Sequence, residues 1–533
     1  MSTIRRIYAY LLAFAGLGML AVATVNLGQL VLELLLHAPS AATAQHVRET
    51  VSIDVAAMLV GLPVWLVHWR WTERWAQGDP LERASTLRRL YVYAVLAAAG
   101  WALAWSTHQV VYAAVSALRD PVLVHDALDQ LPALAVAALL WIGHWRIASR
   151  DRDLVGEAGG AGTLRRWYLY AAAFLGFVGL LGSASGLLES LWRATTGSTR
   201  QLEMAAPLAG VVVGVLVWLA HWAVLPGRIG EDARREDGQA VLRSVYLFLS
   251  LSVGVIGALF GLSQLLYYAV ARLLGVPTPG GVGGDLLQAA AGPGSVAIVF
   301  SLAWAYHRRA LRQQAAAFHE APRQAGVRRL YTSIIGLIAL AALAVGVAGL
   351  LWTAGDLVFN SAAANTGDRW RNNIALFSTL TAVGLPIWLL HWRAVPGSDA
   401  DVRSLARRLY LYLALIAAML SLVGSAALAL YRVISLLLGE SSTSAVLTDL
   451  IHALAVAIVA ALVAAYHWRI LRADAQRSSA PATLQSEAPA ETRVTLQIRA
   501  ATPVALEQAI AALRSTGVEV SVLGFVDAAR AAD

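Results

Sequence analysis

Cysteine and lysine are both absent from this chain of 533 residues. Without cysteine the chain can form no disulfide, no thiolate metal site and no cysteine nucleophile. Because lysine is absent, arginine supplies all 41 basic residues, and the formal net charge is +8. Charged residues make up only 14% of the chain against 58% hydrophobic residues, a composition that excludes an ordinary soluble globule.

Common catalytic motifs are missing as well. The patterns GxxxxGK, HExxH and GxSxG do not occur, which argues against P-loop, zinc-peptidase and serine-hydrolase chemistry. We therefore expect no catalytic residue, no metal and no cofactor. The pI of about 9.9 is typical of nucleic-acid-binding proteins, but these arginines are spread along apolar segments, so we expect no nucleic acid partner.

Long apolar runs are the most abundant feature of the chain, whose mean hydropathy is +0.61. The runs 7–36 and 90–118 both exceed the roughly 20 residues that cross about 30 Å of hydrocarbon. The first is too long for a secretory signal and has no small-residue cleavage site, so we interpret it as a permanent helix. The sequence predicts an all-α polytopic protein of the lipid bilayer.

A motif of arginine and tyrosine opens an apolar run six times, at intervals of about 80 residues. The copies are RRIYAY from Arg5, RRLYVY from Arg88, RRWYLY from Arg165, RSVYLF from Arg243, RRLYTS from Arg328 and RRLYLY from Arg407. Each repeat closes with a histidine hexad: WLVHWR from Trp65, WIGHWR from Trp141, WLAHWA from Trp218, WAYHRR from Trp304, WLLHWR from Trp388 and AAYHWR from Ala464. The separation fits two spanning helices and a turn, so each repeat is predicted to be a helical hairpin.

A longer period lies above the first. The odd repeats share VGLPVW-like patterns from Val60, Val213 and Val383, whereas the even repeats share acidic starts at Asp129, Asp285 and Asp449. The unit is therefore four helices, present three times. We predict about twelve transmembrane helices in units 1–155, 156–320 and 321–473.

Arginine is far more frequent at the start of the chain and between repeats than in the loops inside the hairpins. The positive-inside rule then predicts that both termini and all motif ends face the cytoplasm. We expect the cytoplasmic (inner) membrane as location, with anionic lipid headgroups as possible partners of the arginines.

The composition changes after Arg472. Residues 474–492 are rich in Ala, Ser, Pro and Glu, as in a flexible linker. Residues 493–533 predict a small cytoplasmic β-α-β domain, in which Thr502 caps and Gly517 ends the helix between two alternating strands. About 40 residues bury too small a core, so we expect a homo-oligomer, a partner, or docking on the membrane domain.

The RRxYxY starts, the HWR ends and the four-helix period resemble an uncharacterised bacterial family of tandem four-helix membrane modules, a domain of unknown function. The resemblance covers Arg5 to Arg472 and excludes the tail. It implies no activity, cofactor or site. Departures from the repeated pattern fall in repeats four and five, at Ser244, Phe248, Arg308, Thr332 and Ser333.

Histidines recur at the ends of the returning helices, beside tryptophan and arginine. Facing histidines can bind haem iron or another metal, and imidazole can carry protons. Because Trp, Tyr and Arg all favour the membrane interface, we interpret these residues instead as interfacial anchors. The predicted anchors are His68, His144, His221, His307, His391 and His467, with Tyr8, Tyr91, Tyr168 and Tyr410.

Ionisable residues inside spans are rarer, because an unpaired charge in hydrocarbon is costly. Asn26, Gln29 and Glu33 share one face of the first helix, and Asp54 lies on the antiparallel second helix. We predict that these four side chains meet and bind a ligand. Structural hydrogen bonding is the alternative.

These patterns together predict a non-enzymatic membrane scaffold for binding or passage of a small solute, an ion or a lipid. Two alternatives stay open. The first alternative is a membrane sensor that signals through its C-terminal domain. The second is a redox protein that holds haem or another metal. An enzyme is not expected.

Overall fold

The computed structural model describes residues 3–36, 41–157, 159–196, 203–227, 231–279, 285–317, 322–359, 367–392, 398–439, 443–479, 507–508 and 510–512. All regular structure in these residues is helical, as the apolar periodicity predicted. Residues Met1–Ser478 form one compact unit, and Ser479–Asp533 form a second.

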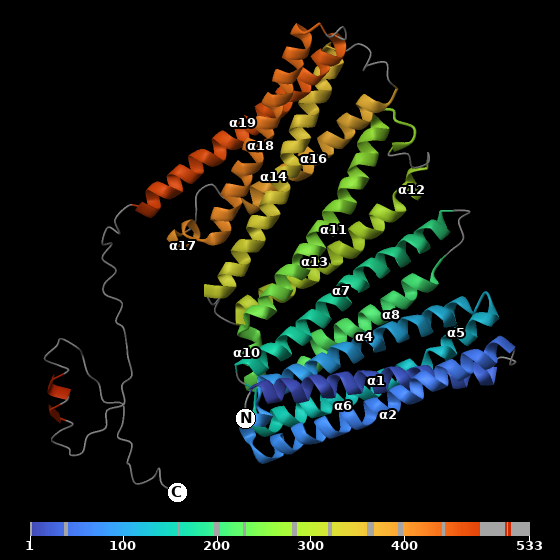
Figure 1. Cartoon of the computed structure of the whole chain (residues 1–533). Helices are drawn as coiled ribbons and strands as arrows, with labels where there is room; N and C mark the ends of the chain where they lie inside the picture. The colour runs from blue at the N-terminus through green and yellow to red at the C-terminus, as the bar shows by residue number, and fades with distance from the viewer. Residues whose placement is uncertain are drawn as a thin grey trace. The chain divides into compact units, whose positions relative to one another are not determined.

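Long helices pair in chain order into antiparallel hairpins (Figure 1). The pairs are α1 (Thr3–Leu36) with α2 (Ala41–Gly78), α4 (Thr86–Ser116) with α6 (Leu131–Val155), α7 (Gly160–Thr195) with α8 (Ala205–Leu219), α11 (Val241–Leu273) with α13 (Ala291–Ala317), and α14 (Pro322–Phe359) with α16 (Arg369–His391). In the sixth repeat, α18 (Leu405–Leu437) and α19 (Thr443–Ser479) meet at the motif end, where the hydroxyl of Tyr410 lies 3.1 Å from Nε2 of His467. Each hairpin corresponds to one sequence repeat.

Among the described residues, 11 helices are long and apolar enough to cross a membrane, one fewer than predicted. The repeat pattern predicts that α13 spans the membrane, but α13 is not among these 11 helices. It still pairs with α11. Its apolar stretch is short because Gly292–Ser295 precede it and Arg308 and Arg309 follow it. The chain is therefore a helical protein with membrane-length helices, and a twelfth span stays a prediction.

Small residues allow the helices of a hairpin to approach closely. Eight positions after the first tyrosine, every repeat has glycine or alanine: Gly16, Ala99, Gly176, Gly254, Ala339 and Ala418. A Cβ atom on Gly16 would lie 2.6 Å from the backbone nitrogen of Trp65, and one on Gly176 would lie 2.8 Å from that of Trp218. No side chain fits at these two crossings without separating the helices.

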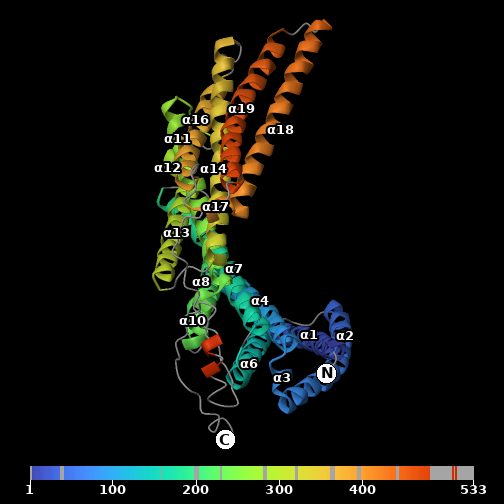
Figure 2. The ribbon, with the colours of Figure 1, turned by 90° about the vertical axis from the view of Figure 1, so that its left-hand side faces the viewer.

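Consecutive hairpins stack by one repeated rule (Figure 2). The first helix of a hairpin contacts both helices of the next one, as α1 contacts α4 and α6, and α4 contacts α7 and α8. The same relation joins α7 to α11 and α13, and α11 to α14 and α16. The long helices therefore form a linear array, in which the first four steps are built from equivalent contacts as in a solenoid.

Short helices mark the longer, four-helix period. In the middle of each unit lies a short helix that joins its two hairpins: α3 (Pro80–Arg83), α10 (Glu231–Gln239) and α17 (Asp399–Val402). Short segments also precede the returning helices of the second and fourth hairpins, namely η1 (Pro121–Leu123) with α5 (Val124–Asp129), and α12 (Leu286–Ala289). In unit two, α8 continues through a π-helical turn, η2 (Ala220–Val224), into α9 (Leu225–Gly227).

The boundary before the tail differs from the prediction. Residues 474–479, assigned above to the flexible linker, continue α19, because the carboxylate of Asp474 is held by Arg407 at 2.6 Å. Residues 507–508 and 510–512 are helical and lie inside the predicted tail helix. The predicted strands and most of the linker lie outside the described residues.

Candidate functional site

Every repeated histidine is fixed by its own helix. Its Nδ1 atom lies 2.7–3.0 Å from the carbonyl oxygen four residues earlier, in His68, His144, His221, His307, His391 and His467. Because a carbonyl only accepts, Nδ1 carries the ring hydrogen. Nε2 is therefore the ring nitrogen left for a partner on another element.

In three repeats the first tyrosine is that partner. The hydroxyl of Tyr168 lies 3.0 Å from Nε2 of His221, and the equivalent distances are 3.1 Å for Tyr246 with His307 and for Tyr410 with His467. The same hydroxyl oxygens accept an indole N–H from the preceding hairpin, at 2.8–2.9 Å, from Trp141, Trp218 and Trp388 respectively. One hydroxyl thus joins two hairpins.

The second aromatic residue of the motif reaches forward to the next repeat. Ring centroids lie 5.3–5.8 Å apart in the pairs Tyr10 with Tyr91, Tyr93 with Tyr168, Tyr170 with Tyr246, and Phe248 with Tyr331. These contacts repeat the same step along the array, so the motif is a joint between hairpins.

The first arginine of the even repeats stacks on a tryptophan of the preceding hairpin, and Arg88 and Arg407 are buried there. Arg88, Arg243 and Arg407 stack over Trp69, Trp222 and Trp392 at 4.7–5.3 Å. Seven residues after the histidine, Asp151 meets Arg88 at 2.7 Å, and Asp474 meets Arg407 at 2.6 Å. Unit two has Gln314 there, and its amide donates to the carbonyl of Gly238 at 3.1 Å.

The second arginine of the odd repeats binds the short helix in the middle of its unit. The pairs are Arg6 with Glu82, Arg166 with Asp237 and Arg329 with Asp401. Burial alone would raise the pKa of Asp401, but the hydrogen bond and charge of Arg329 outweigh it and hold the pKa below its usual value. In each unit, this arginine is therefore neutralised by an acidic residue of the short helix.

These contacts change the interpretation of the predicted anchors. His307 and His467 are 0% and 1% exposed, and Tyr91, Tyr168 and Tyr410 are buried, so the rings lie between helices and join hairpins. Only Tyr8, 55% exposed, has the exposure of an interfacial anchor. On His221, His307 and His467 both ring nitrogens are hydrogen-bonded, which leaves no free nitrogen for haem iron.

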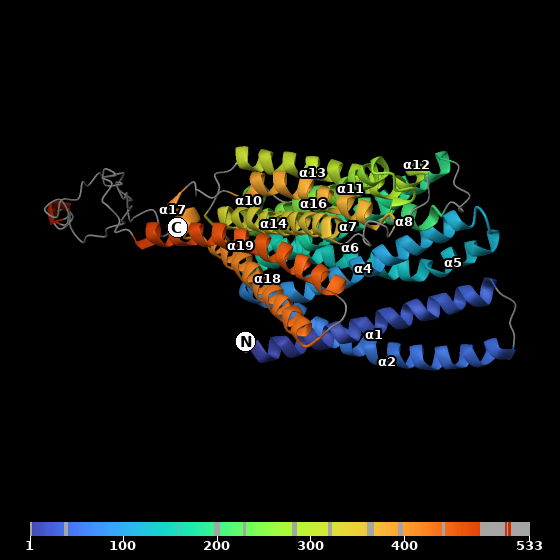
Figure 3. The same cartoon turned by 90° about the horizontal axis from the view of Figure 1, so that it is seen from above.

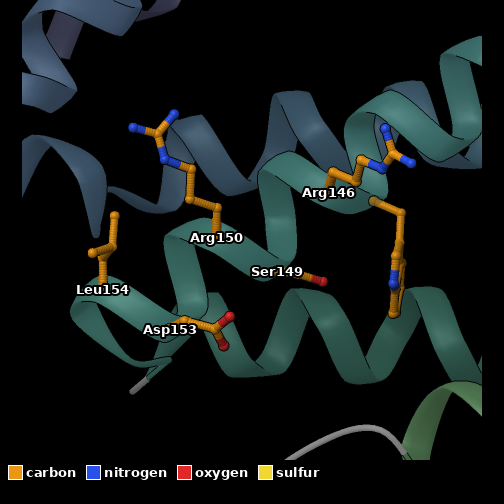
Figure 4. Close-up of a pocket in the computed structure, with 6 residues that line it drawn as sticks. Arg146, Ser149, Arg150, Asp153 and Leu154 are labelled. Carbon is orange, nitrogen blue, oxygen red and sulfur yellow. The ribbon is translucent and has the colours of Figure 1, made fainter.

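An open groove of about 530 Å³ lies on one face of α6 at this end. Figure 4 shows Arg146 and Arg150 projecting from the same side of the helix, above Ser149 and Asp153. Glu73 lies 3.8 Å from Arg150 but nearer to Arg88, at 2.8 Å, and Asp153 lies 3.9 Å from Arg152. The groove thus has basic and acidic side chains along one helix face.

The opposite end of the hairpins contains the predicted polar cluster, of which the structure assembles one pair. Asn26 donates to the carboxylate of Asp54 at 3.1 Å, and Asp54 is 5% exposed. Gln29 donates instead to the backbone oxygen of Asp129 at 3.1 Å, on α5 of the next hairpin. Glu33 lies 3.8 Å from His46 at a more exposed position.

The electrostatic setting of Asp54 differs from that of the acids at the motif end. In the described ranges, no arginine or histidine lies within ion-pair distance of its carboxylate, which has an amide as its hydrogen-bonding partner. Asp151, equally buried, has two arginines, Arg83 and Arg88, within 3.3 Å. Asp54 is thus a buried acid without a compensating cation.

A second pair at this end was missed by the sequence reasoning. Nε2 of His452 lies 2.8 Å from Asp356, and the other carboxylate oxygen accepts from Trp352 at 3.1 Å. Gly355 permits the approach, because a Cβ atom there would lie 2.1 Å from Ile451. Asp356 is a polar residue within an apolar run of the sequence. His452 could not be assigned to it from the sequence, because the packing of α19 on α14 brings the two together.

Fifteen residues before the histidine of the even repeat, the three units have different groups. Unit one has Asp129, whose backbone carbonyl accepts a hydrogen bond from Gln29. Unit two has Gly292, and unit three has His452. A Cβ atom on Gly292 would lie 3.4 Å from the carboxylate of Glu189. Among the described residues, no group of three or more His, Asp or Glu side chains is placed to hold a metal ion.

The fold and these contacts define a class: a membrane-type helical repeat array with a joint at one end and variable polar pairs at the other. The chain belongs to the family described as Domain of unknown function (DUF5671), which matches residues 6–131, 117–205, 185–293 and 329–451. The first and fourth matches begin at Arg6 and Arg329, the equivalent arginines of repeats one and five. No curated protein and no solved structure matches the chain.

Proposed function

We propose that this protein is a non-enzymatic membrane scaffold that binds a small cation at Asp54, with Asn26 as its neighbour. The observation that supports the proposal is the burial of the Asp54 carboxylate, 5% exposed, within a membrane-length helix and beside an amide. An ionised carboxylate in such surroundings costs several kcal/mol unless a cation accompanies it, by order of magnitude.

Oxygen atoms suited to a hard cation are present at the pair. The Asp54 carboxylate supplies two, and the amide of Asn26, whose nitrogen is used in the hydrogen bond, retains its carbonyl oxygen. Carboxylate and amide oxygens are the ligands that hard cations prefer in proteins. Anions and electron-rich solutes would be repelled by the same carboxylate.

The proposal includes the orientation of the chain. Arginine is concentrated at the motif ends, so these ends and both termini face the cytoplasm of the inner membrane, and Asp54 lies toward the opposite side. The tail from Ser479 onward then lies in the cytoplasm, where it pairs with a second copy or with a partner. The small size of the tail supports pairing with a second copy or a partner, because a domain of about 40 residues buries too little apolar surface to be stable alone.

Thermal unfolding of the full chain in detergent tests the cation site. We expect the Tm of the wild type to rise with added sodium or potassium chloride, compared with choline chloride at equal ionic strength, because a ligand of the folded state stabilises it. The rise should disappear in Asp54→Asn, which keeps the shape and removes the charge.

Glu33→Gln is the matched control, because it removes an acid of the same hairpin that is more exposed. It should keep the cation-dependent rise. A rise that is equal in the wild type and in Asp54→Asn, or no rise in the wild type, would overturn the proposal.

A further inference from the structure

The hairpin α1–α2 exposes a surface that the other hairpins cover. At three inner steps of the array, the first tyrosine accepts an indole N–H from the preceding hairpin, as Tyr168 does from Trp141 at 2.8 Å. In the described part of the chain no hairpin packs in front of α1, and Tyr8 is 55% exposed. Figure 3 shows α1 and α2 together at one edge of the array.

The arginine beside this tyrosine also differs from its equivalents. Seven residues after His68, the sequence has Trp75 where the second and sixth repeats have Asp151 and Asp474. Arg5 stacks over the ring of Trp75 at 4.6 Å and is exposed. Within the described ranges, no carboxylate pairs with Arg5, so its charge is free to bind an anion.

These residues form a pocket of about 160 Å³, lined by Arg5, Tyr8, Ala9, Trp71 and Trp75. His68 stands behind it, with its ring centroid 5.6 Å from Tyr8 and 5.2 Å from Trp71. The pocket thus combines one guanidinium, one hydroxyl and two indole rings.

We propose that this pocket binds the phosphate of an anionic phospholipid headgroup. Guanidinium groups bind phosphate with paired, charge-assisted hydrogen bonds, and the Tyr8 hydroxyl can donate a further one. Tryptophan and tyrosine rings favour the depth of the headgroups, where one side of the ring is apolar and the other is wet. The volume suits a phosphate with part of its glycerol, so the acyl chains lie outside, along α2.

The charges around the pocket favour an anion. Of the neighbouring arginines, Arg6 is already paired with Glu82, whereas Arg74 is exposed and unpaired among the described residues. Glu73, the acid next along α2, is bound to Arg88 at 2.8 Å. This inference rests on the array and its motif residues, and not on the cation site at Asp54.

Native mass spectrometry of the full-length protein, titrated with phosphatidylglycerol in detergent, tests the proposal. Arg5→Gln should weaken the tightest lipid-binding step about tenfold, the effect expected from loss of one charge-assisted contact. Arg74→Gln removes an exposed charge from the same hairpin and should stay within about twofold of the wild type. Trp71→Leu, which removes a wall and no charge, should also weaken binding.

Three results would overturn the proposal. Equal lipid binding in the wild type, Arg5→Gln and Trp71→Leu would remove the pocket as a site. Equal losses in Arg5→Gln and Arg74→Gln would indicate general surface charge. Displacement of the lipid by millimolar inorganic phosphate would make the pocket a site for free phosphate, whereas resistance to displacement supports a lipid.

Discussion

The two ends of the hairpins are built from different kinds of contact. At the motif end, tyrosine, histidine and tryptophan meet in the same way in three hairpins, in the triads of Tyr168, Tyr246 and Tyr410. At the other end, the three units hold an amide-bound carbonyl, a glycine beside a carboxylate and an imidazole bound to a carboxylate.

This difference separates architecture from chemistry. Contacts that recur in every unit are the ones that any repeat array needs in order to stack, and their charges are compensated. Contacts that vary between units are not needed for stacking. Asp54 belongs to the variable end and has no compensating cation among the described residues, which is why we propose a cation site there and assign a structural role to the motif contacts inside the array.

The largest expected effect is at the buried ion pair between α4 and α6. Arg88→Leu leaves Asp151 buried with one weaker partner, Arg83 at 3.3 Å, and should lower the free energy of unfolding by about 3 kcal/mol or more. Arg146→Leu, on the exposed face of α6, should change it by less than about 0.5 kcal/mol. Denaturant unfolding of the two variants measures the contrast, and equal small losses would contradict a structural motif end.

A smaller loss is expected where the helices of a hairpin touch. Gly16→Leu should destabilise by about 1–3 kcal/mol, because its side chain meets the backbone at Trp65. Gly18→Leu is the control two residues away, where a Cβ atom has no neighbour within 4 Å. Thermal unfolding of both variants should separate them; similar melting would mean that the crossing is looser than described.

The hydroxyl joint should contribute somewhat less. Tyr168→Phe leaves the indole N–H of Trp141 and the Nε2 of His221 without their shared partner, at an expected cost of about 1–2 kcal/mol. Tyr8→Phe, at an exposed position, should cost almost nothing. If the two variants unfold alike, the hydroxyl does not hold the hairpins together.

The smallest effect concerns pH at the surface of unit three. Because Arg329 holds the pKa of Asp401 below its usual value, the pair stabilises the fold above the pKa of the unfolded chain. That contribution is lost as the pH falls through the folded pKa. Asp401→Asn should therefore lower stability by a few tenths of a kcal/mol at pH 7 and not at all at low pH. If the loss of stability caused by Asp401→Asn grew as the pH fell, the prediction would be wrong.

The sequence predicts the hairpins well, because they follow from the period of short motifs, whereas the division into three four-helix units stays a prediction. It also predicts the contact of Asn26 with Asp54, since the two residues lie on adjacent helices of one hairpin. It fails where a partner comes from another hairpin: Gln29 reaches α5, and His452 reaches α14. The motif histidines were interpreted as anchors from the interfacial preference of their neighbours. The Tyr–His–Trp joint was not predicted, because its tryptophan comes from the preceding repeat.

Infrared difference spectroscopy of the full-length protein, with and without sodium or potassium, tests the central claim most directly, because it observes the carboxylate itself. The account predicts a cation-induced change in a carboxylate stretch that is present in the wild type and in Glu33→Gln and absent in Asp54→Asn. A difference spectrum that is the same in the wild type and in Asp54→Asn would contradict it.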